Sequence, residues 1–172
     1  LQLDGTENKS NLGANASLAA SLAFAKSLAV QSSNQFFSYL SNNKNFLLPV
    51  PMINIINGGS HADNNIDIQE FMIAPIGANN FSQALMYGCE IFHSLKSILK
   101  SKKLNTNVGD EGGFAPDLSD SRKVIEIIID SVESTGLQMG KDIFLALDIA
   151  SSEFYKDNLY NLSGEKKKLS SE

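Results

Sequence analysis

Two adjacent carboxylates, Asp110 and Glu111, lie within a glycine-rich stretch of the chain, from Asn107 to Pro116. The glycines around the pair remove side-chain bulk and tolerate positive φ angles, so the backbone can turn tightly against a ligand. A carboxyl group held in such a turn can act as a general acid if its surroundings raise its pKa toward neutrality. The stretch therefore predicts a proton donor. An acidic surface turn, which would use the same glycines and proline, is the alternative interpretation.

Asp148 directly follows an apolar run, Ile143 to Leu147, that predicts a buried strand. In barrels and open α/β sheets, ligands gather at the carboxyl ends of the strands. A carboxylate there suits Mg²⁺, which prefers hard oxygen donors. Asp148 is therefore a candidate metal ligand, unless it only caps the following turn.

Three further polar residues could serve the same site. His61 follows a Gly-Gly-Ser turn, where backbone and imidazole could approach an anionic ligand. Gln69 and Glu70 lie in an otherwise apolar segment, 68–76, where a buried charge is costly without a partner. This conflict points either to function or to an interior polar network. Because neighbouring residues of a regular strand face opposite sides, Gln69 and Glu70 could reach one site only at a bulge or at the strand's end.

Hydrophobic spacing predicts the elements that must hold these residues. Apolar residues recur at intervals of three and four over 81–99 and 121–133, which predicts two amphipathic helices. An Ala-rich helix is predicted over 11–30 and a short helix over 36–40, followed by a polar linker at 41–45. Apolar runs at 47–57, 68–76 and 143–147 predict strands. The order strand, strand, helix, helix, strand indicates an α/β fold, and a parallel crossover would pack its last three elements.

The overall composition is that of a globular protein, with 172 residues of which 42% are hydrophobic and 19% are charged. The net charge is -5 and no basic stripe is interleaved with aromatics, so nucleic acid is not an expected partner. A single cysteine favours a reducing compartment such as the cytoplasm. No apolar run reaches the roughly 20 residues of a spanning helix, so no membrane span is expected. The chain starts without Met and ends in a helix-start composition, which suggests a segment of a longer polypeptide.

Six stretches, in this order, resemble the enolase family. They are LDGTENKS at 3–10, GANA at 13–16, PVPMINIINGGSHA at 49–62, QEFM at 69–72, NVGDEGGFAP at 107–116, and LD with ASSEFYKD over 147–157. The resemblance implies that residues 1–42 are the C-terminal helical part of a small α+β N-terminal domain. It also implies that residues 43–172 are the first part of a TIM-like catalytic barrel. A whole barrel takes about 250 residues, so only a partial barrel is expected.

The resemblance implies a glycolytic lyase, phosphopyruvate hydratase, which reversibly dehydrates 2-phosphoglycerate to phosphoenolpyruvate with Mg²⁺. In such an enzyme Glu111 would be the general acid and Asp148 a Mg²⁺ ligand. His61, Gln69 and Glu70 would contact the substrate. The family's catalytic base, a lysine, and its remaining metal and phosphate ligands belong to later barrel strands, so this segment alone is expected to be inactive.

The family is usually dimeric, which implies a homodimer in the cytoplasm, and enolases are also met on cell surfaces. Two other functions stay open. The chain could bind other proteins, with the lysine-bearing segment 156–172 as the surface to consider. It could also belong to another lyase or isomerase of the enolase superfamily, although the stretches at 58–62 and 107–116 argue against this.

Overall fold

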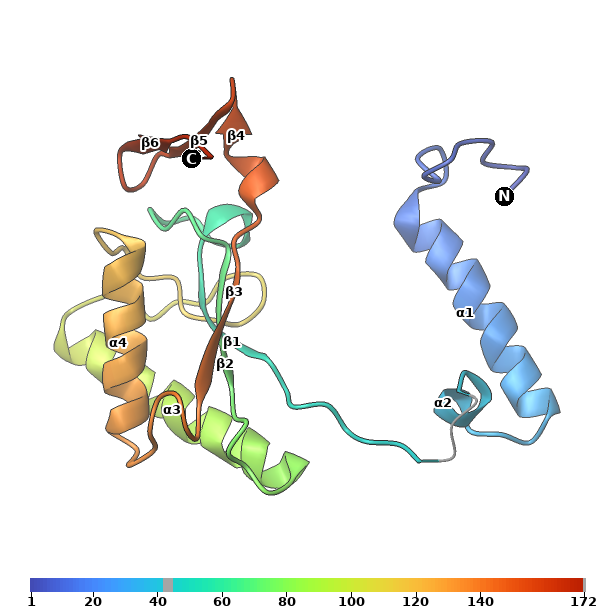
Figure 1. Cartoon of the computed structure of the whole chain (residues 1–172), viewed down its shortest axis with the longest axis horizontal. Coiled ribbons are helices and arrows are strands. Elements are labelled where there is room, and N and C mark those ends of the chain that lie inside the picture. Colours follow the sequence, from blue (N-terminus) through green and yellow to red (C-terminus); the bar gives the residue numbers. More distant parts are fainter. Residues whose placement is uncertain (42–44, 172) are drawn as a thin grey trace. The chain divides into compact units, whose positions relative to one another are not determined.

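The computed structural model describes residues 1–41 and 45–171 and divides into two compact units, Leu1–Leu47 and Leu48–Glu172. In the first unit, helix α1 spans Gly13–Gln31 and helix α2 spans Phe36–Tyr39 (Figure 1). Both agree with the predicted helices within a few residues at each end. The linker predicted at 41–45 includes residues 42–44, which lie outside the described residues.

A buried carboxylate organises the loop before α1. Asp4 is only 3% exposed, and its Oδ1 accepts hydrogen bonds from the Thr6 backbone N–H at 3.0 Å and from the Thr6 hydroxyl. Its Oδ2 accepts a hydrogen bond from the Leu12 N–H at 2.7 Å. These hydrogen bonds, that of the Thr6 hydroxyl foremost, lower the pKa of Asp4. The carboxylate thereby ties the loop to the start of the helix.

A three-stranded sheet forms the frame of the second unit. Its strands are β1 (Ile53–Asn57), β2 (Glu70–Ala74) and β3 (Phe144–Asp148), in that order across the sheet. The strand predicted over 47–57 is too long, because pairing begins only at Ile53. The preceding segment contains Pro49 and Pro51, which have no backbone N–H to donate to a neighbouring strand.

The predicted parallel crossover between β2 and β3 is wrong, because the two strands are antiparallel. Two helices, α3 (Phe81–Ser101) and α4 (Ser121–Glu133), lie between them in the chain. One helix takes the chain back along the sheet and the second returns it to the end of β2. There the Gly77 N–H donates to the Asp142 carbonyl oxygen at 2.9 Å, so β3 starts beside the end of β2. A strand that starts there must run antiparallel to β2.

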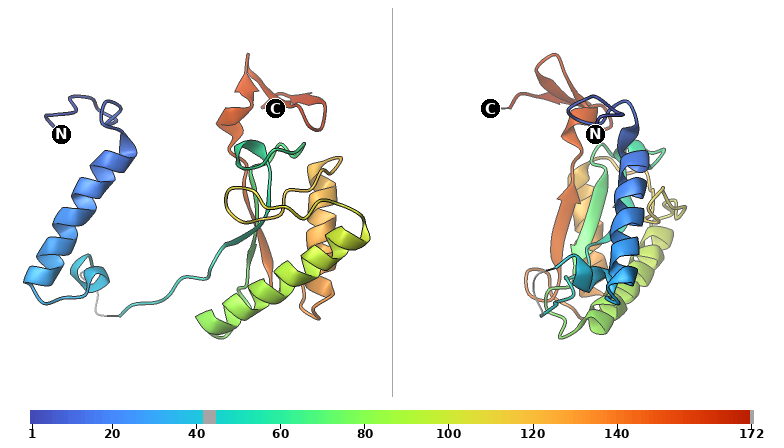
Figure 2. Two further views of the ribbon diagram at one scale, coloured as in Figure 1. Left: turned by 180° about the vertical axis from the view of Figure 1, so that it is seen from behind. Right: turned by 90° about the vertical axis from the view of Figure 1, so that its right-hand side faces the viewer.

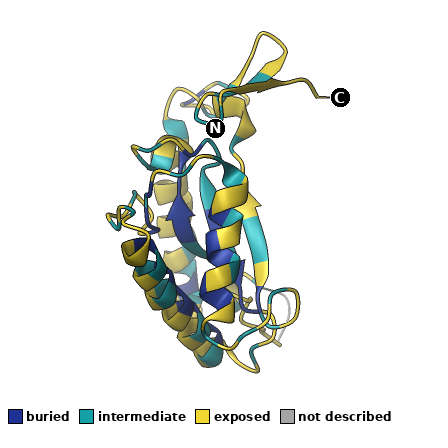
Figure 3. Cartoon of the chain, turned by 90° about the vertical axis from the view of Figure 1, so that its left-hand side faces the viewer, coloured by how far each residue is buried: buried dark blue, intermediate teal, exposed yellow. Residues whose placement is uncertain are grey.

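Packing of α3 and α4 on the sheet forms the core of the second unit. Their bounds follow the predicted helices closely, and the side chains of Asn80 and Asp120 cap them by accepting hydrogen bonds from Gln83 and Lys123 N–H. Buried residues gather where the helices face the strands (Figure 3). The fully buried apolar side chains are Ile55, Ile56, Phe71, Ile73, Ile91, Leu95, Leu99, Phe114, Val124, Ile128, Val132 and Ile143.

A second small sheet, which the sequence reading does not predict, follows β3. Its antiparallel strands β4 (Tyr155–Lys156), β5 (Leu159–Leu162) and β6 (Lys167–Leu169) stand at one end of the unit (Figure 2). The Asp67 carboxylate accepts hydrogen bonds from the N–H groups of Gly164 at 2.9 Å and Glu165 at 3.0 Å. The β4–β6 sheet is therefore anchored to the loop between β1 and β2.

The predicted fold class, an α/β partial barrel preceded by a helical segment, is confirmed. The strands in the described ranges form open sheets and no closed barrel. None of the helices in the described part of the chain is long and apolar enough to cross a bilayer.

Candidate active site

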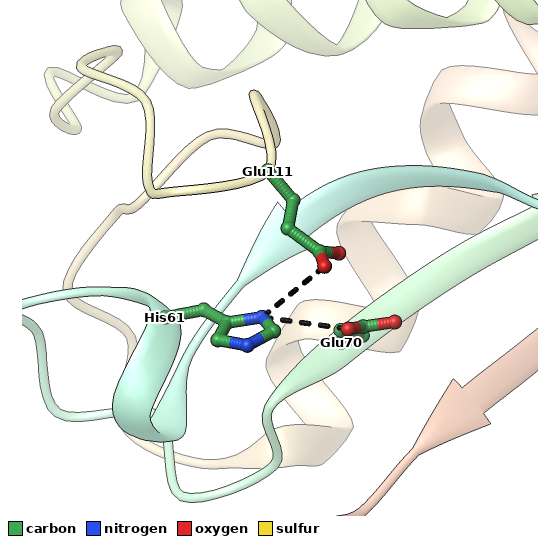
Figure 4. Close-up of side chains that lie close together, drawn as sticks. All are labelled: His61, Glu70 and Glu111. Atoms are coloured by element: carbon green, nitrogen blue, oxygen red, sulfur yellow. Dashed lines mark ion pairs between the residues drawn. The ribbon is translucent and has the colours of Figure 1, made fainter. Parts of the chain in front are cut away.

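Three titratable side chains from separate segments converge on one side of the sheet (Figure 4). His61 ends the short 3-10 helix η1 (Gly59–His61), Glu70 begins β2, and Glu111 lies in the glycine-rich turn. His61 Nδ1 is 3.4 Å from Glu70 Oε1 and 3.9 Å from Glu111 Oε1. These three candidate residues, which are far apart in the sequence, are thus neighbours in the structure.

The loop between β1 and β2 places His61 by folding back on itself. The Gly58 N–H donates to the Gln69 carbonyl oxygen at 2.9 Å. A Cβ on Gly58 would lie 2.4 Å from the Ile68 carbonyl oxygen, so only glycine allows the two sides of the loop to approach this closely. His61 is consequently held opposite the start of β2.

The glycine-rich turn is held against this loop through its backbone. The Asp110 N–H donates to the His61 carbonyl oxygen at 2.9 Å, and the Gly109 N–H donates to the Gly113 carbonyl oxygen at 2.9 Å. A Cβ on Gly113 would lie 2.4 Å from Asn57 Oδ1, and a Cβ on Gly109 would lie 2.5 Å from the His61 carbonyl oxygen. The glycines therefore permit the close backbone approach expected from the sequence, and Asp110 orients the turn through its backbone N–H.

A β-bulge in β1 decides which side chains face the site. The register shifts after Asn54, so that Asn54 lies opposite Met72 while Asn57 lies opposite Glu70. Residues opposite each other in antiparallel strands share a face of the sheet. In a regular strand, Asn54 and Asn57 would face opposite sides, because they are an odd number of residues apart. The bulge puts both on the face that also carries Glu70 and its partner in β3, Asp148.

Asn54 and Asn57 belong to the site, although the sequence reading does not single them out. Asn54 Nδ2 donates a hydrogen bond to Glu111 Oε2 at 3.0 Å. Asn57 is fully buried, and neither atom of its side-chain amide has a hydrogen-bond partner among the described residues. The sequence does contain a signal that could have identified them. Two amide side chains lie in a strand of otherwise apolar residues, where burying a polar group is unfavourable without a partner.

The carboxyl groups of Glu70 and Glu111 have pKa values shifted in opposite directions. Burial raises the pKa of Glu70, and the hydrogen bond with Glu111 and the charges of Glu111 and Asp148 raise it further. The hydrogen bond from Asn54 lowers the pKa of Glu111, and the hydrogen bond with Glu70 lowers it as well. Two carboxyl groups this close titrate as a coupled pair. The opposite shifts give Glu70 a greater tendency than Glu111 to hold a proton.

Replacing Glu70 with glutamine should stabilise the fold increasingly as the pH rises. Because the pKa of Glu70 is raised in the folded state, the unfolded state loses its proton first, and wild-type stability falls as the pH rises through the folded pKa. Glutamine cannot ionise, so Glu70→Gln escapes this loss. Urea denaturation of the chain at about pH 4 and about pH 8 measures the difference. An equal effect at both pH values would contradict the shift, and Glu90→Gln, at an exposed position of α3, is the control.

Gln69 and Asp148 flank Glu70. Gln69 lies just before β2 begins, and its Oε1 accepts a hydrogen bond from Ser60 Oγ at 2.6 Å. Asp148 ends β3 directly opposite Glu70, and its Oδ1 accepts a hydrogen bond from the Ala150 N–H at 3.0 Å. Gln69 and Glu70 can both lie near the site because β2 begins at Glu70, so Gln69 precedes the regular strand. A position at the strand's end is one of the two ways, expected from the sequence, in which both residues could reach one site.

The donor atoms of the site differ in the metals that they suit. Asp148 is exposed and offers a carboxylate oxygen, the donor that Mg²⁺ prefers. His61, Glu70 and Glu111 also bring three potential donor atoms within 4.8 Å of one another. An imidazole nitrogen suits a transition metal better than Mg²⁺. The Asp148 carboxylate is therefore a donor of the kind that fits Mg²⁺, whereas the three converging side chains combine two carboxylates with an imidazole nitrogen.

Two family profiles match this chain. Residues 45–172 match the family described as Enolase, C-terminal TIM barrel domain. Residues 1–40 match the family described as Enolase, N-terminal domain. The first match alone covers well over half of the chain and contains every residue of the site described above.

Proposed function

Because this chain belongs to the enolase family, we propose that it is part of a lyase that reversibly dehydrates 2-phosphoglycerate to phosphoenolpyruvate with Mg²⁺. One observation carries the proposal, the convergence of the His61, Glu70 and Glu111 side chains on one side of the sheet. Loss of a hydroxyl group is slow unless a proton reaches the departing oxygen. The carboxyl pair of Glu70 and Glu111 is the proposed source of such a proton.

Glu111 is the proposed general acid. Its side chain is 45% exposed and can reach a ligand, whereas that of Glu70 is only 13% exposed. As the carbon–oxygen bond breaks, the departing hydroxyl would leave as water by taking a proton from Glu111. The surroundings lower the pKa of Glu111, whereas the sequence-based expectation for a general acid is a raised pKa, and they raise the pKa of Glu70. The proton is therefore proposed to reach Glu111 from Glu70. Glu70 is thus the proposed proton store.

His61 and Gln69 are the proposed substrate contacts beside this pair. His61 Nδ1 is buried and has no hydrogen-bond partner among the residues that the structure describes, although both carboxyl groups lie near it. A buried polar atom without a partner is unfavourable, and a bound hydroxyl or phosphate oxygen would satisfy it. Gln69, joined to Ser60, borders the same side of the loop.

Asp148 is the proposed Mg²⁺ ligand. Bound Mg²⁺ would supply the positive charge that stabilises negative charge developing on the substrate carboxylate. Asp148 stands next to Glu70 across the sheet, so a cation held there would lie beside the proton-transfer pair.

The Asp148→Ala variant of the gene product that contains this chain should need roughly 10- to 100-fold more Mg²⁺ for half-maximal turnover, because one oxygen ligand is lost. Raising the Mg²⁺ concentration should restore part of the rate. A titration of initial rates against Mg²⁺ measures the change, with Asp117→Ala, an exposed residue after the glycine-rich turn, as the control. An unaltered Mg²⁺ dependence in Asp148→Ala would remove this residue from the metal site.

The proposed reaction is tested by following phosphoenolpyruvate absorbance with 2-phosphoglycerate and Mg²⁺ as the only additions to the same gene product. We expect reversible formation of phosphoenolpyruvate. If 2-phosphoglycerate is left unchanged while another carboxylate substrate is dehydrated or isomerised, a different reaction of the superfamily replaces the one proposed.

We also propose that residues 1–42 are the helical end of the N-terminal domain and that residues 43–172 begin the catalytic barrel. The two compact units, which divide after Leu47, and the two matched ranges, 1–40 and 45–172, support this division. A homodimer and a cytoplasmic location are further proposals that follow from family membership.

A further inference from the structure

We propose that Asn54 is a positioning residue that holds one carboxylate oxygen of Glu111, so that the other oxygen faces His61 and Glu70. Asn54 Nδ2 donates to Glu111 Oε2 at 3.0 Å, while Glu111 Oε1 lies 3.9 Å from His61 Nδ1. The two oxygens of the acid therefore have different surroundings. This inference rests on the proposed role of Glu111 in proton transfer.

The glycine-rich turn fixes the backbone of Glu111 but not its side chain. Backbone hydrogen bonds and the close approach of Gly113 to Asn57 hold the turn. The Glu111 side chain is 45% exposed, and an exposed glutamate can adopt several staggered rotamers. A hydrogen bond from a residue on a paired strand selects one of them. Asn54 provides it, because Asn54 is paired opposite Met72 inside the sheet.

The orientation of the Asn54 amide supports this role. Its Oδ1 is buried and has no hydrogen-bond partner among the residues of the described ranges. Burying an acceptor without a hydrogen-bond partner is unfavourable. Turning the amide around would place Oδ1 against the Glu111 carboxylate, where two acceptors repel. The amide is therefore oriented to serve Glu111, although its own acceptor stays unpaired.

An amide also suits the charges around Glu111. The titratable groups that face Glu111 are His61 of η1 and Glu70 of β2, and Asp148 of β3 lies opposite Glu70. His61 is a proposed substrate contact and Glu70 is the proposed proton store, so both have other roles in the cycle than holding Glu111. The asparagine N–H₂ group does not titrate and remains a donor at every protonation state of its neighbours.

The first test uses the 172-residue chain and needs no activity. Carboxyl carbon NMR gives the pH midpoint of Glu111 in the wild type, Asn54→Leu and Asn54→Asp. Loss of the donor should raise the midpoint in Asn54→Leu, and the like charge of Asn54→Asp should raise it further. The matched controls are Asn79→Leu and Asn79→Asp, at an exposed position before α3, and these should leave it unchanged. If Asn54→Leu disturbs the fold, the near-isosteric Asn54→Asp variant provides the test. An unchanged pH midpoint of Glu111 in Asn54→Asp would overturn the inference.

The second test measures turnover in the gene product that contains this chain. Asn54→Leu should lower kcat by about 10- to 100-fold with little change in KM, because a misplaced acid impairs the reaction more than binding. If Glu111→Gln leaves turnover unchanged while the Asn54 variants move the NMR midpoint, the proposed function fails and the positioning contact stands. If Glu111→Gln abolishes turnover while Asn54→Leu changes neither midpoint nor kcat, the inference alone is overturned.

Discussion

Turnover of 2-phosphoglycerate is expected to fall by about 10²- to 10⁴-fold when Glu111 is replaced by glutamine, the range typical for loss of a general acid. Glutamine keeps the size of the side chain and an oxygen that can accept the hydrogen bond from Asn54. It cannot relay a proton from Glu70 to the departing hydroxyl. The fold and Mg²⁺ binding should therefore survive while the chemistry is lost. Initial rates, metal titration and circular dichroism of Glu111→Gln separate these effects.

The adjacent carboxylate provides the sharpest control for this experiment. Asp110 orients the turn through its backbone N–H, which Asp110→Asn retains, and its side chain is exposed. We expect Asp110→Asn to lower turnover by less than about tenfold, because no acid–base group is removed. Similar losses in the two variants would mean that the turn needs negative charge in general and would argue against Glu111 as the acid.

Replacing Phe114 with alanine is expected to lower the free energy of unfolding by about 3–5 kcal/mol, as for other large side chains removed from a packed core. Phe114 is 1% exposed, and its ring stacks on Phe92 with centroids 4.3 Å apart. Its N–H donates to the Ile55 carbonyl oxygen, and its own carbonyl oxygen accepts from the Asn57 N–H. The residue thus joins the glycine-rich turn to β1 and to the core.

Urea denaturation followed by circular dichroism measures this loss, with Phe144→Ala as the matched control. Phe144 begins β3 and is 40% exposed, so its truncation removes less buried area and should destabilise the fold clearly less. Equal losses in the two variants would show that Phe114 does not anchor the turn through the core. A loss confined to Phe114→Ala would link the position of the acid to the packing beneath it.

Local patterns were sufficient to predict the helices. The apolar residues of α3 and α4 recur at helical spacing. Asn80 caps α3 and Asp120 caps α4, and each cap directly precedes its helix in the sequence. Local patterns could not predict that β3 runs antiparallel to β2, because the direction of β3 depends on where the chain leaves the two packed helices. The β4–β6 sheet also escaped prediction. Its anchor at Asp67 lies 97 residues from Gly164 in the sequence, so no local pattern contains it.

The sequence by itself determined the family resemblance, the α/β partial barrel and the residue types that could move a proton or bind Mg²⁺, because these depend on composition, spacing and short motifs. Only the tertiary structure decided that His61, Glu70 and Glu111 converge and that the pKa values of Glu70 and Glu111 shift in opposite directions. It alone also joined Asn54 to Glu111, 57 residues away. The physical reason is that a pKa and a side-chain orientation are set by neighbours in space. Here those neighbours come from a bulged strand, a folded-back loop and a turn that the sequence keeps far apart.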